Sequence, residues 1–271
     1  MAFDPLNGGD WKAIAPAIAA FPRQLLAALL FYTQLPLTPG TTLAFERVAC
    51  WAPVVGVLLG VGLGLGDRLL AAWHLPDLLR SSLVVCVWLW ITGGLHLDGA
   101  MDTADGLAVA PDRRLAVMAD SASGAFAVMV AIAILLLKTT ALASLSHGHL
   151  LALTAAAGWG RWGQQVAIAY YPYLKATGKG ALHQAALRSG WDLLPGLLLL
   201  LGVCALPLGS GNSAWPLTLL ALTGGAIAPL VAYGFGRQLG GHTGDSYGAV
   251  VEWTETLILL VFAAGYPSLP L

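Results

Sequence analysis

The chain has 271 residues, of which 58% are hydrophobic and only 10% are charged, and its formal net charge is −1. Because soluble domains carry about 25% charged residues, this composition excludes an ordinary soluble domain and indicates a membrane protein with several spans. The thirteen Lys and Arg residues form no long basic run, so the sequence gives no indication of a nucleic-acid partner.

Apolar windows long enough to cross a lipid bilayer recur along the chain and predict an all-α fold with about seven transmembrane helices. The seven windows are 48–66, 81–97, 125–145, 150–171, 193–208, 215–236 and 249–266. Ahead of them, 23–37 is apolar but short and is punctuated by prolines, which is typical of an interfacial or re-entrant helix. We therefore expect a single domain, with an N-terminal segment (1–47) preceding a transmembrane catalytic part (48–271).

The distribution of basic residues favours a first apolar segment that does not span the membrane. Nine of the thirteen Lys and Arg then lie on one side, Arg68 and Arg80 lie on the other, and Lys138 and Arg161 fall within spans. If the first segment spans, the split becomes seven to four and the same loops stay cytoplasmic. The positive-inside rule thus places 98–120, 172–192 and 237–248 on the cytoplasmic face.

Three carboxylates follow the second apolar window. Asp98, Asp102 and Asp105 are spaced i, i+4, i+7, so a helix would carry them on one face, where they would repel one another without a cation. Mg²⁺ prefers such oxygen ligands and is commonly shared between carboxylates and substrate phosphates. The alternative is a solvated helix start, since acids also favour helix N-termini.

Other polar residues flank these acids. His96 adjoins them and either orients a ligand or packs. Asp120 and Ser121 precede the third window, where they either cap that helix or add to the site.

Two cations lie inside apolar windows, where an unpaired charge costs about 2.5–3.5 kcal/mol on insertion scales. Lys138 and Arg161 either line a phosphate-binding cavity or form structural ion pairs or snorkel to the membrane surface.

The last apolar window begins with two acids, Glu252 and Glu255, which would share a helix face. A glycine-rich stretch precedes them and contains Gly241, Thr243, Gly244 and Asp245. Glycines allow backbone N–H groups to approach a phosphate, particularly ahead of a helix. We interpret this stretch as part of the site, although glycine-rich turns between spans are common.

The sequence GGLHLDGAMDTADGL at 93–107 resembles the hallmark of the cobalamin synthase family. The resemblance extends in order to WAPVVG (51–56) with Gly60, MADS (118–121) with Gly124, LLLK (135–138), Arg161 and GGHTGDSYGAVVEWTE (240–255). It thus covers nearly the whole chain. Gln34 and Ala122 stand where the family pattern usually has arginine, and Ala127 where it usually has glycine.

The resemblance implies an inner-membrane transferase, an adenosylcobinamide-GDP ribazoletransferase. In that reaction α-ribazole or its 5′-phosphate attacks the cobinamide-side phosphorus of adenosylcobinamide-GDP, and GMP leaves. Mg²⁺ is the implied cofactor, with Asp98, Asp102, Asp105, Asp120 and Asp245 as its ligands. One of these acids or Glu252 would accept the proton, and Lys138 and Arg161 would neutralise phosphate oxygens.

The substrate-binding residues expected from the same patterns are His96, Ser121, Gly241, Thr243, Gly244 and Glu255. Homo-oligomerisation and association with other enzymes of the cobalamin pathway stay open.

Two other classes of membrane protein compete with this interpretation, namely another Mg²⁺-dependent transferase that handles a diphosphate, and a transporter. CDP-alcohol phosphotransferases and intramembrane prenyltransferases also use Asp-rich helices with Mg²⁺, but the stretch at 98–103 lacks the Ala-Arg pair of the former, and no second Asp-rich run supports the latter. A transporter would use Lys138, Arg161, Glu252 and Glu255 as a pathway lining. It would leave the three clustered aspartates unexplained.

Overall fold

The computed structural model describes residues 11–40, 42–175, 184, 187, 189–205 and 215–265, and these form ten α-helices and no β-strand. The helices are α1 (Trp11–Tyr32), α2 (Ala52–Ala72), α3 (Asp77–Thr92), α4 (Leu95–Leu107), α5 (Arg114–Val117), α6 (Ala125–Ala143), α7 (His149–Tyr170), α9 (Leu194–Ala205), α10 (Trp215–Leu239) and α11 (Gly244–Gly265). Short 3₁₀ turns cover Val48–Trp51, Pro111–Arg113 and Gly190–Leu193. The all-α prediction is confirmed for the described part of the chain.

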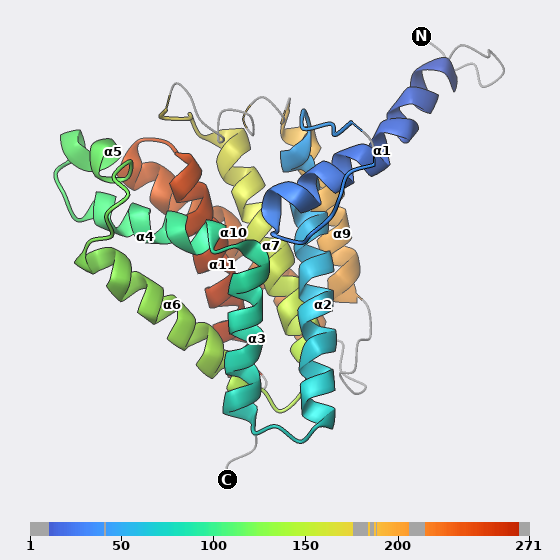
Figure 1. Cartoon of the computed structure of the whole chain (residues 1–271), viewed down its shortest axis with the longest axis vertical. Helices are drawn as coiled ribbons and strands as arrows, with labels where there is room; N and C mark the ends of the chain where they lie inside the picture. Colours follow the sequence, from blue (N-terminus) through green and yellow to red (C-terminus); the bar gives the residue numbers. More distant parts are fainter. Residues whose placement is uncertain are drawn as a thin grey trace.

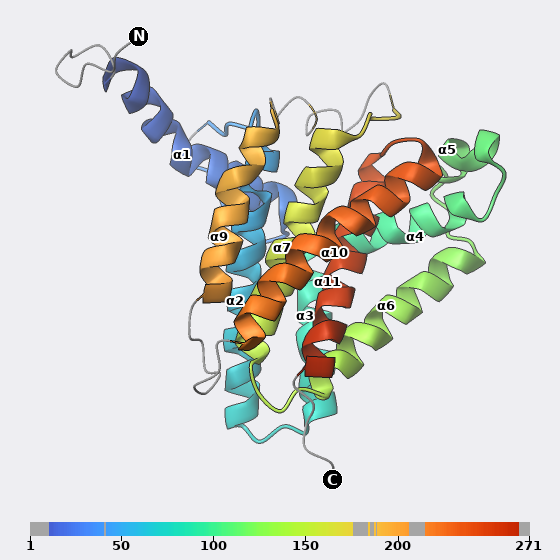
Figure 2. The same cartoon turned by 180° about the vertical axis from the view of Figure 1, so that it is seen from behind.

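Helix α7 forms the centre of the bundle. Every residue from His149 to Ile168 is buried, and α2, α9, α10 and α11 all pack against it. The two opposite views show α2, α7 and α9 running roughly along the long axis and α10 crossing them obliquely, with α4 lying across the bundle near the end that carries α5 (Figures 1 and 2). An apolar helix buried on all sides is typical of the core of a membrane bundle.

Helices α2 and α7 approach closely because α2 carries glycines four residues apart. Gly56, Gly60 and Gly64 all face α7, and a Cβ at Gly60 would overlap the backbone at Thr154. In a bilayer, lipid tails are as apolar as leucine, so helix association depends on this kind of close small-residue packing. The glycines thus fix the spacing of the two most extensively packed helices.

The chain turns sharply between α3 and α4. Gly93 and Gly94 both adopt positive φ angles, 62° and 69°, which glycine tolerates without steric cost. The two helices meet at 89°. The predicted continuous span 81–97 is therefore wrong at its end, because α3 stops at Thr92 and Leu95 already belongs to the transverse helix.

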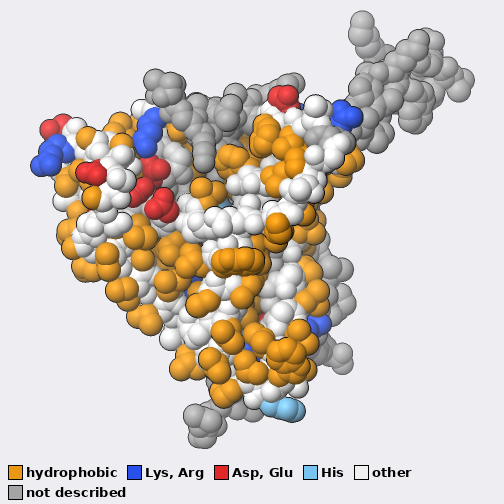
Figure 3. All heavy atoms as spheres, in the orientation of Figure 1, with side chains coloured by type: hydrophobic (Ala, Val, Ile, Leu, Met, Phe, Trp, Pro, Cys, Tyr) orange, Lys and Arg blue, Asp and Glu red, His pale blue; other side chains and the backbone are white. Residues whose placement is uncertain are grey.

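Three helical segments are long and apolar enough to cross a membrane, and the bent α3–α4 pair is a fourth candidate, within the described residues. Large apolar side chains point outward from them, for example Leu65, Met129 and Leu136, each more than half exposed. Figure 3 shows this apolar surface over much of the face in view, with a group of acidic and basic side chains at the α5 end. Such a surface is that of a membrane protein.

The predicted windows from 125 onward agree with the helices within a few residues, except that α11 begins at Gly244 rather than at Ala249. Among the earlier segments, α2 covers Ala52–Ala72 rather than 48–66, and α1 extends over Trp11–Tyr32 rather than 23–37. Pro22 is accommodated within α1, and the helix ends at Tyr32, four residues ahead of Pro36. The end of window 193–208 lies outside the described residues.

Gly60→Ala is expected to lower the free energy of unfolding by about 1–3 kcal/mol, because the added Cβ would overpack against α7. Gly62→Ala is the matched control, since a Cβ at Gly62 meets no heavy atom within 4 Å, and Ala favours a helix over Gly by about 1 kcal/mol. Thermal denaturation of the purified protein in detergent compares them. Equal melting temperatures would contradict the close α2–α7 packing.

Candidate functional site

Helix α4 presents its acids at the end of the bundle because its other face packs against α11. Gly99 lies against the backbone of Asp245, where a Cβ would come within 2.5 Å of the carbonyl oxygen, and the backbone of His96 lies against Gly248. The His96 ring is buried and stacks on Tyr32 with ring centroids 6.1 Å apart. This burial leaves Asp98 exposed and Asp102 partly exposed.

Asp102 lies at the centre of a group of negative charges. Partial burial, followed by the charges of Asp98 and Asp245, raises the pKa of the Asp102 carboxyl to about 6, while Lys175 opposes this effect. Helix α4 lies across the bundle axis, outside the segments that run along it (Figure 1). Carboxylates that repel one another in this way form an environment that favours a bound cation.

Two of the five predicted metal ligands are engaged elsewhere. Both carboxylate oxygens of Asp105 accept backbone N–H groups at the start of α6, from Gly124 at 2.6 Å and from Ala127 at 2.9 Å. Asp120 accepts the N–H of Ala122 at 3.0 Å within its own turn. The described residues contain no group of three or more His, Cys, Asp or Glu side chains placed to hold a metal by themselves.

Ser121 lies exposed in the turn that precedes α6. The expectation that Asp120 or Ser121 caps α6 is therefore wrong, because the backbone N–H groups at the start of α6 donate to Asp105 of α4.

The glycine-rich stretch is the structured N-terminus of α11 and not an open loop. Gly240 and Gly241 adopt positive φ angles, and the N–H of Thr243 donates to Ser246 Oγ at 2.8 Å, while the N–H of Ser246 donates to Thr243 Oγ1 at 3.2 Å. These reciprocal bonds close the first turn at Gly244. The N–H groups of Thr243 and Ser246, which were expected to face a phosphate, therefore already donate hydrogen bonds within this turn.

This N-terminus is tied to a segment far away in the sequence. The N–H of His242 donates to Pro172 O at 2.9 Å, and the N–H of Leu174 donates to His242 O at 2.8 Å. His242 is fully buried, and desolvation lowers its pKa to about 4, so the ring is neutral. The pairing brings Lys175 to Asp245, with its Nζ 2.8 Å from the carboxylate.

Lys175 is the site residue that the sequence patterns missed. Its side chain is 29% exposed and influences the Asp102 carboxyl directly. The positive-inside rule had placed its segment on the same face as the acids, but nothing in the local sequence distinguished Lys175 from the other loop cations. The central part of that segment, including Lys179, lies outside the described residues.

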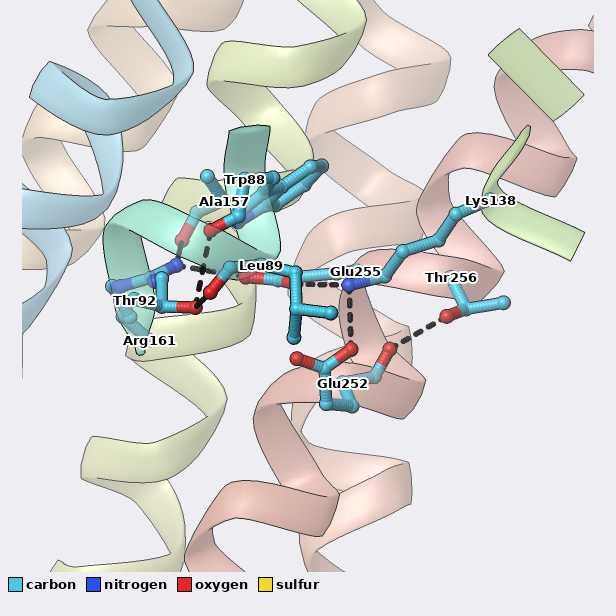
Figure 4. Close-up of polar contacts among 9 residues, drawn as sticks. All are labelled: Trp88, Leu89, Thr92, Lys138, Ala157, Arg161, Glu252, Glu255 and Thr256. Carbon is cyan, nitrogen blue, oxygen red and sulfur yellow. Dashed lines mark hydrogen bonds and ion pairs between the residues drawn. The ribbon is translucent and has the colours of Figure 1, made fainter. Parts of the chain in front are cut away.

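The two intramembrane cations are paired with the two glutamates. Lys138 Nζ lies 2.6 Å from Glu252 Oε2 and 2.6 Å from Glu255 Oε2, and Arg161 Nη1 lies 2.7 Å from Glu255 Oε1. Figure 4 shows Glu255 between the two cations, with Trp88 close by, and the Lys138 ammonium is 4.4 Å from the Trp88 ring centroid. All four charged groups are buried.

The ion-pair interpretation of Lys138 and Arg161 is thus realised in this network, and their binding of a phosphate stays a prediction. Arg161 keeps Nε and Nη2 buried without a hydrogen-bond partner among the described residues.

Comparison with known proteins identifies the family. Residues 24–263 match the model of the cobalamin-5-phosphate synthase family. A protein of Trichormus variabilis named adenosylcobinamide-GDP ribazoletransferase is 60% identical over 88% of this chain and 95% of its own length. Similarly named proteins of a Synechococcus strain and of Synechocystis are 51% and 50% identical, over 89% and 86% of this chain and 96% and 92% of their own lengths.

No solved structure matches the chain significantly. The family match and the curated relatives agree along nearly the full length, and the chain belongs to the cobalamin-5-phosphate synthase family.

Proposed function

We propose that this chain is a membrane-bound adenosylcobinamide-GDP ribazoletransferase. The substrates would be adenosylcobinamide-GDP and α-ribazole or its 5′-phosphate, and the products cobalamin or its 5′-phosphate and GMP. The observation that carries the proposal is the juxtaposition of Asp98, Asp102 and Asp245 with one accessible cation, Lys175. Transfer at a diphosphate depends mainly on positioning and charge stabilisation, which such a group supplies.

The donor set fits Mg²⁺. Asp98, Asp102 and Asp245 offer hard carboxylate oxygens, and partial burial together with the charges of Asp98 and Asp245 raises the pKa of Asp102. Mg²⁺ is usually held by one or two carboxylates together with substrate phosphates and water, so a complete protein cage is not required. When bound there, Mg²⁺ would neutralise charge on the diphosphate oxygens.

In this proposal different side chains stabilise the leaving group, accept the proton and hold the helices in place. Lys175 would donate to a phosphate oxygen of the leaving GMP group, which develops negative charge. We propose that the acid cluster formed by Asp98, Asp102 and Asp245 accepts the proton of the attacking hydroxyl. Glu252 is less suited, because it is only 7% exposed and is held by Lys138. Lys138 and Arg161 would then act by holding α11 in place, and direct phosphate contact is the second candidate for them.

For the topology we propose seven spans in the inner membrane, with the acid cluster on the cytoplasmic side. Helices α7 and α10 contain 22 and 25 residues, which at about 1.5 Å per residue is enough to cross the roughly 30 Å hydrocarbon layer. The shorter apolar helix α9 (Leu194–Ala205) is assigned to the remaining span in this proposal. We retain one domain with an N-terminal segment of residues 1–47 and a transmembrane part of residues 48–271.

The central experiment measures GMP release and cobalamin formation by the lipid-reconstituted protein. Adenosylcobinamide-GDP is supplied with α-ribazole or with α-ribazole 5′-phosphate, each with and without Mg²⁺. Mg²⁺-dependent formation of both products supports the proposal. A folded preparation that forms neither product with either acceptor contradicts it.

Asp102→Asn is expected to lower turnover about 10²–10³-fold, because it removes one charge from the centre of the acid cluster while preserving the shape of the side chain. The apparent Mg²⁺ concentration for half-maximal activity should rise in parallel. Asp112→Asn, at an exposed acid in the turn before α5, should leave both quantities within about twofold of wild type. Near-normal turnover of Asp102→Asn would refute the metal assignment.

Lys175→Met should reduce kcat/KM about tenfold or more, because it removes the proposed hydrogen bond to a phosphate oxygen. A charge-assisted hydrogen bond of this kind contributes roughly 1.5–3 kcal/mol. Arg113→Met is the matched control, since Arg113 is an exposed cation in the turn before α5. Steady-state kinetics with both variants separate a local role from a general loss of positive charge. Equal effects of the two substitutions would argue against a specific role for Lys175.

A further inference from the structure

A pocket of about 620 Å³ lies where the end of α1 meets the corner between α3 and α4. The N–H of Gln34 donates to Ile91 O at 2.7 Å, which fixes the chain after α1 to the end of α3. The Gln34 side chain lies directly on Gly93, where a Cβ would collide with its amide. The turn at Gly93 and Gly94 therefore shapes this pocket and also sets the direction of α4.

The pocket has one apolar and one polar wall. Leu30, Phe31 and Met101 contribute apolar surface, whereas Thr92 and Asp98 contribute a hydroxyl and a carboxylate. Its described lining residues include this carboxylate and no Lys or Arg. Without Mg²⁺ at Asp98, a phosphate or diphosphate would meet an uncompensated negative charge here, whereas a neutral ligand with one flat apolar part and one hydroxylated part suits both walls.

The size of the pocket distinguishes between the two substrates of the proposed reaction. Pockets of about 300–1,000 Å³ hold ligands of drug size, and a nucleoside with a two-ring base is of that size. A corrinoid is several times larger. The pocket volume thus suits a nucleoside and not the whole corrinoid, and the guanosine of the donor, which is of similar size, is the competing occupant.

The pocket also opens onto the acid cluster. Asp98 belongs to its wall, and Asp102 follows one turn later on the same helix, an axial rise of about 6 Å. A hydroxyl group held at Asp98 is therefore adjacent to the carboxylates assigned to the reacting diphosphate.

We propose that this pocket is the binding site of the benzimidazole nucleoside acceptor, an inference that rests on the function proposed above. The base lies between Phe31 and Met101, which offer ring and thioether contacts, and the ribose faces Asp98. A 5′-phosphate, where present, projects through the open side of the pocket. The site therefore selects the acceptor by its neutral, flat base.

In the transfer step a ribose hydroxyl oxygen forms a bond to the cobinamide-side phosphorus. The bond between that phosphorus and the bridging oxygen breaks, and GMP leaves with the electron pair. The hydroxyl proton passes to a carboxylate of the acid cluster and then to water.

Leu95→Trp tests the proposal because Leu95 lines the pocket and is 38% exposed, so a larger side chain fills the space without entering the core. Leu115→Trp is the matched control, at an equally exposed leucine (38%) of α5 that does not line the pocket. We expect Leu95→Trp to raise KM for α-ribazole about tenfold or more, and KM for adenosylcobinamide-GDP to stay within about twofold. Leu115→Trp should leave both KM values within about twofold.

A second variant, Phe31→Ala, removes a contact to the base without filling the pocket and should raise KM for α-ribazole several-fold. A selective rise in KM for adenosylcobinamide-GDP would overturn the proposal, as would unchanged KM values in both pocket variants, which would indicate a lipid-filled or empty pocket.

Equilibrium binding of α-ribazole alone to the wild type and to Leu95→Trp separates this proposal from the function on which it rests. Weaker binding to the variant supports the pocket even if no cobalamin is formed. Equal binding overturns the pocket assignment even if the transfer reaction is confirmed.

Discussion

The structure depends on the requirement that charges buried among apolar helices be paired. Glu255 satisfies it by accepting hydrogen bonds from Lys138 of α6 and Arg161 of α7. Breaking a buried pair by removing one partner typically costs about 3–5 kcal/mol, because the other charge is left uncompensated. The network therefore fixes α6, α7 and α11 relative to one another. Helix α4 packs on α6 and α11, so the position of its acids follows from this pairing.

This pairing separates two kinds of cation in the molecule. Lys138 and Arg161 are neutralised by glutamates within the bundle, whereas Lys175 lies partly exposed at the carboxylate of Asp245. A substrate that arrives from water with a diphosphate group can reach only the second kind without disrupting buried ion pairs. Lys138 and Arg161 thus stabilise the packing of the helices, whereas Lys175 belongs to the charged surface at which the transfer is proposed.

The corner at Gly93 and Gly94 connects the fold to that surface. It ends α3 and turns the next helix by 89°, so that one continuous apolar-to-acidic sequence forms two helices, of which the second carries the acids across the bundle. The same corner, covered by Gln34, forms one wall of the pocket beside Asp98. One backbone feature thus positions both the acids and the proposed acceptor site, and neither glycine could be replaced without backbone strain.

The sequence by itself determined the helical class, the boundaries of α6, α7 and α10 and the acidic helix, because apolar run length and helical periodicity are local properties. It also contained the residues of the charge network but could not pair them, since Lys138 is 114 and 117 residues away from its partners. Only the tertiary structure turned Asp105 to the start of α6 and brought Lys175 to Asp245, 70 residues away. Which charge meets which carboxylate is decided by packing between distant segments, and no local pattern encodes it.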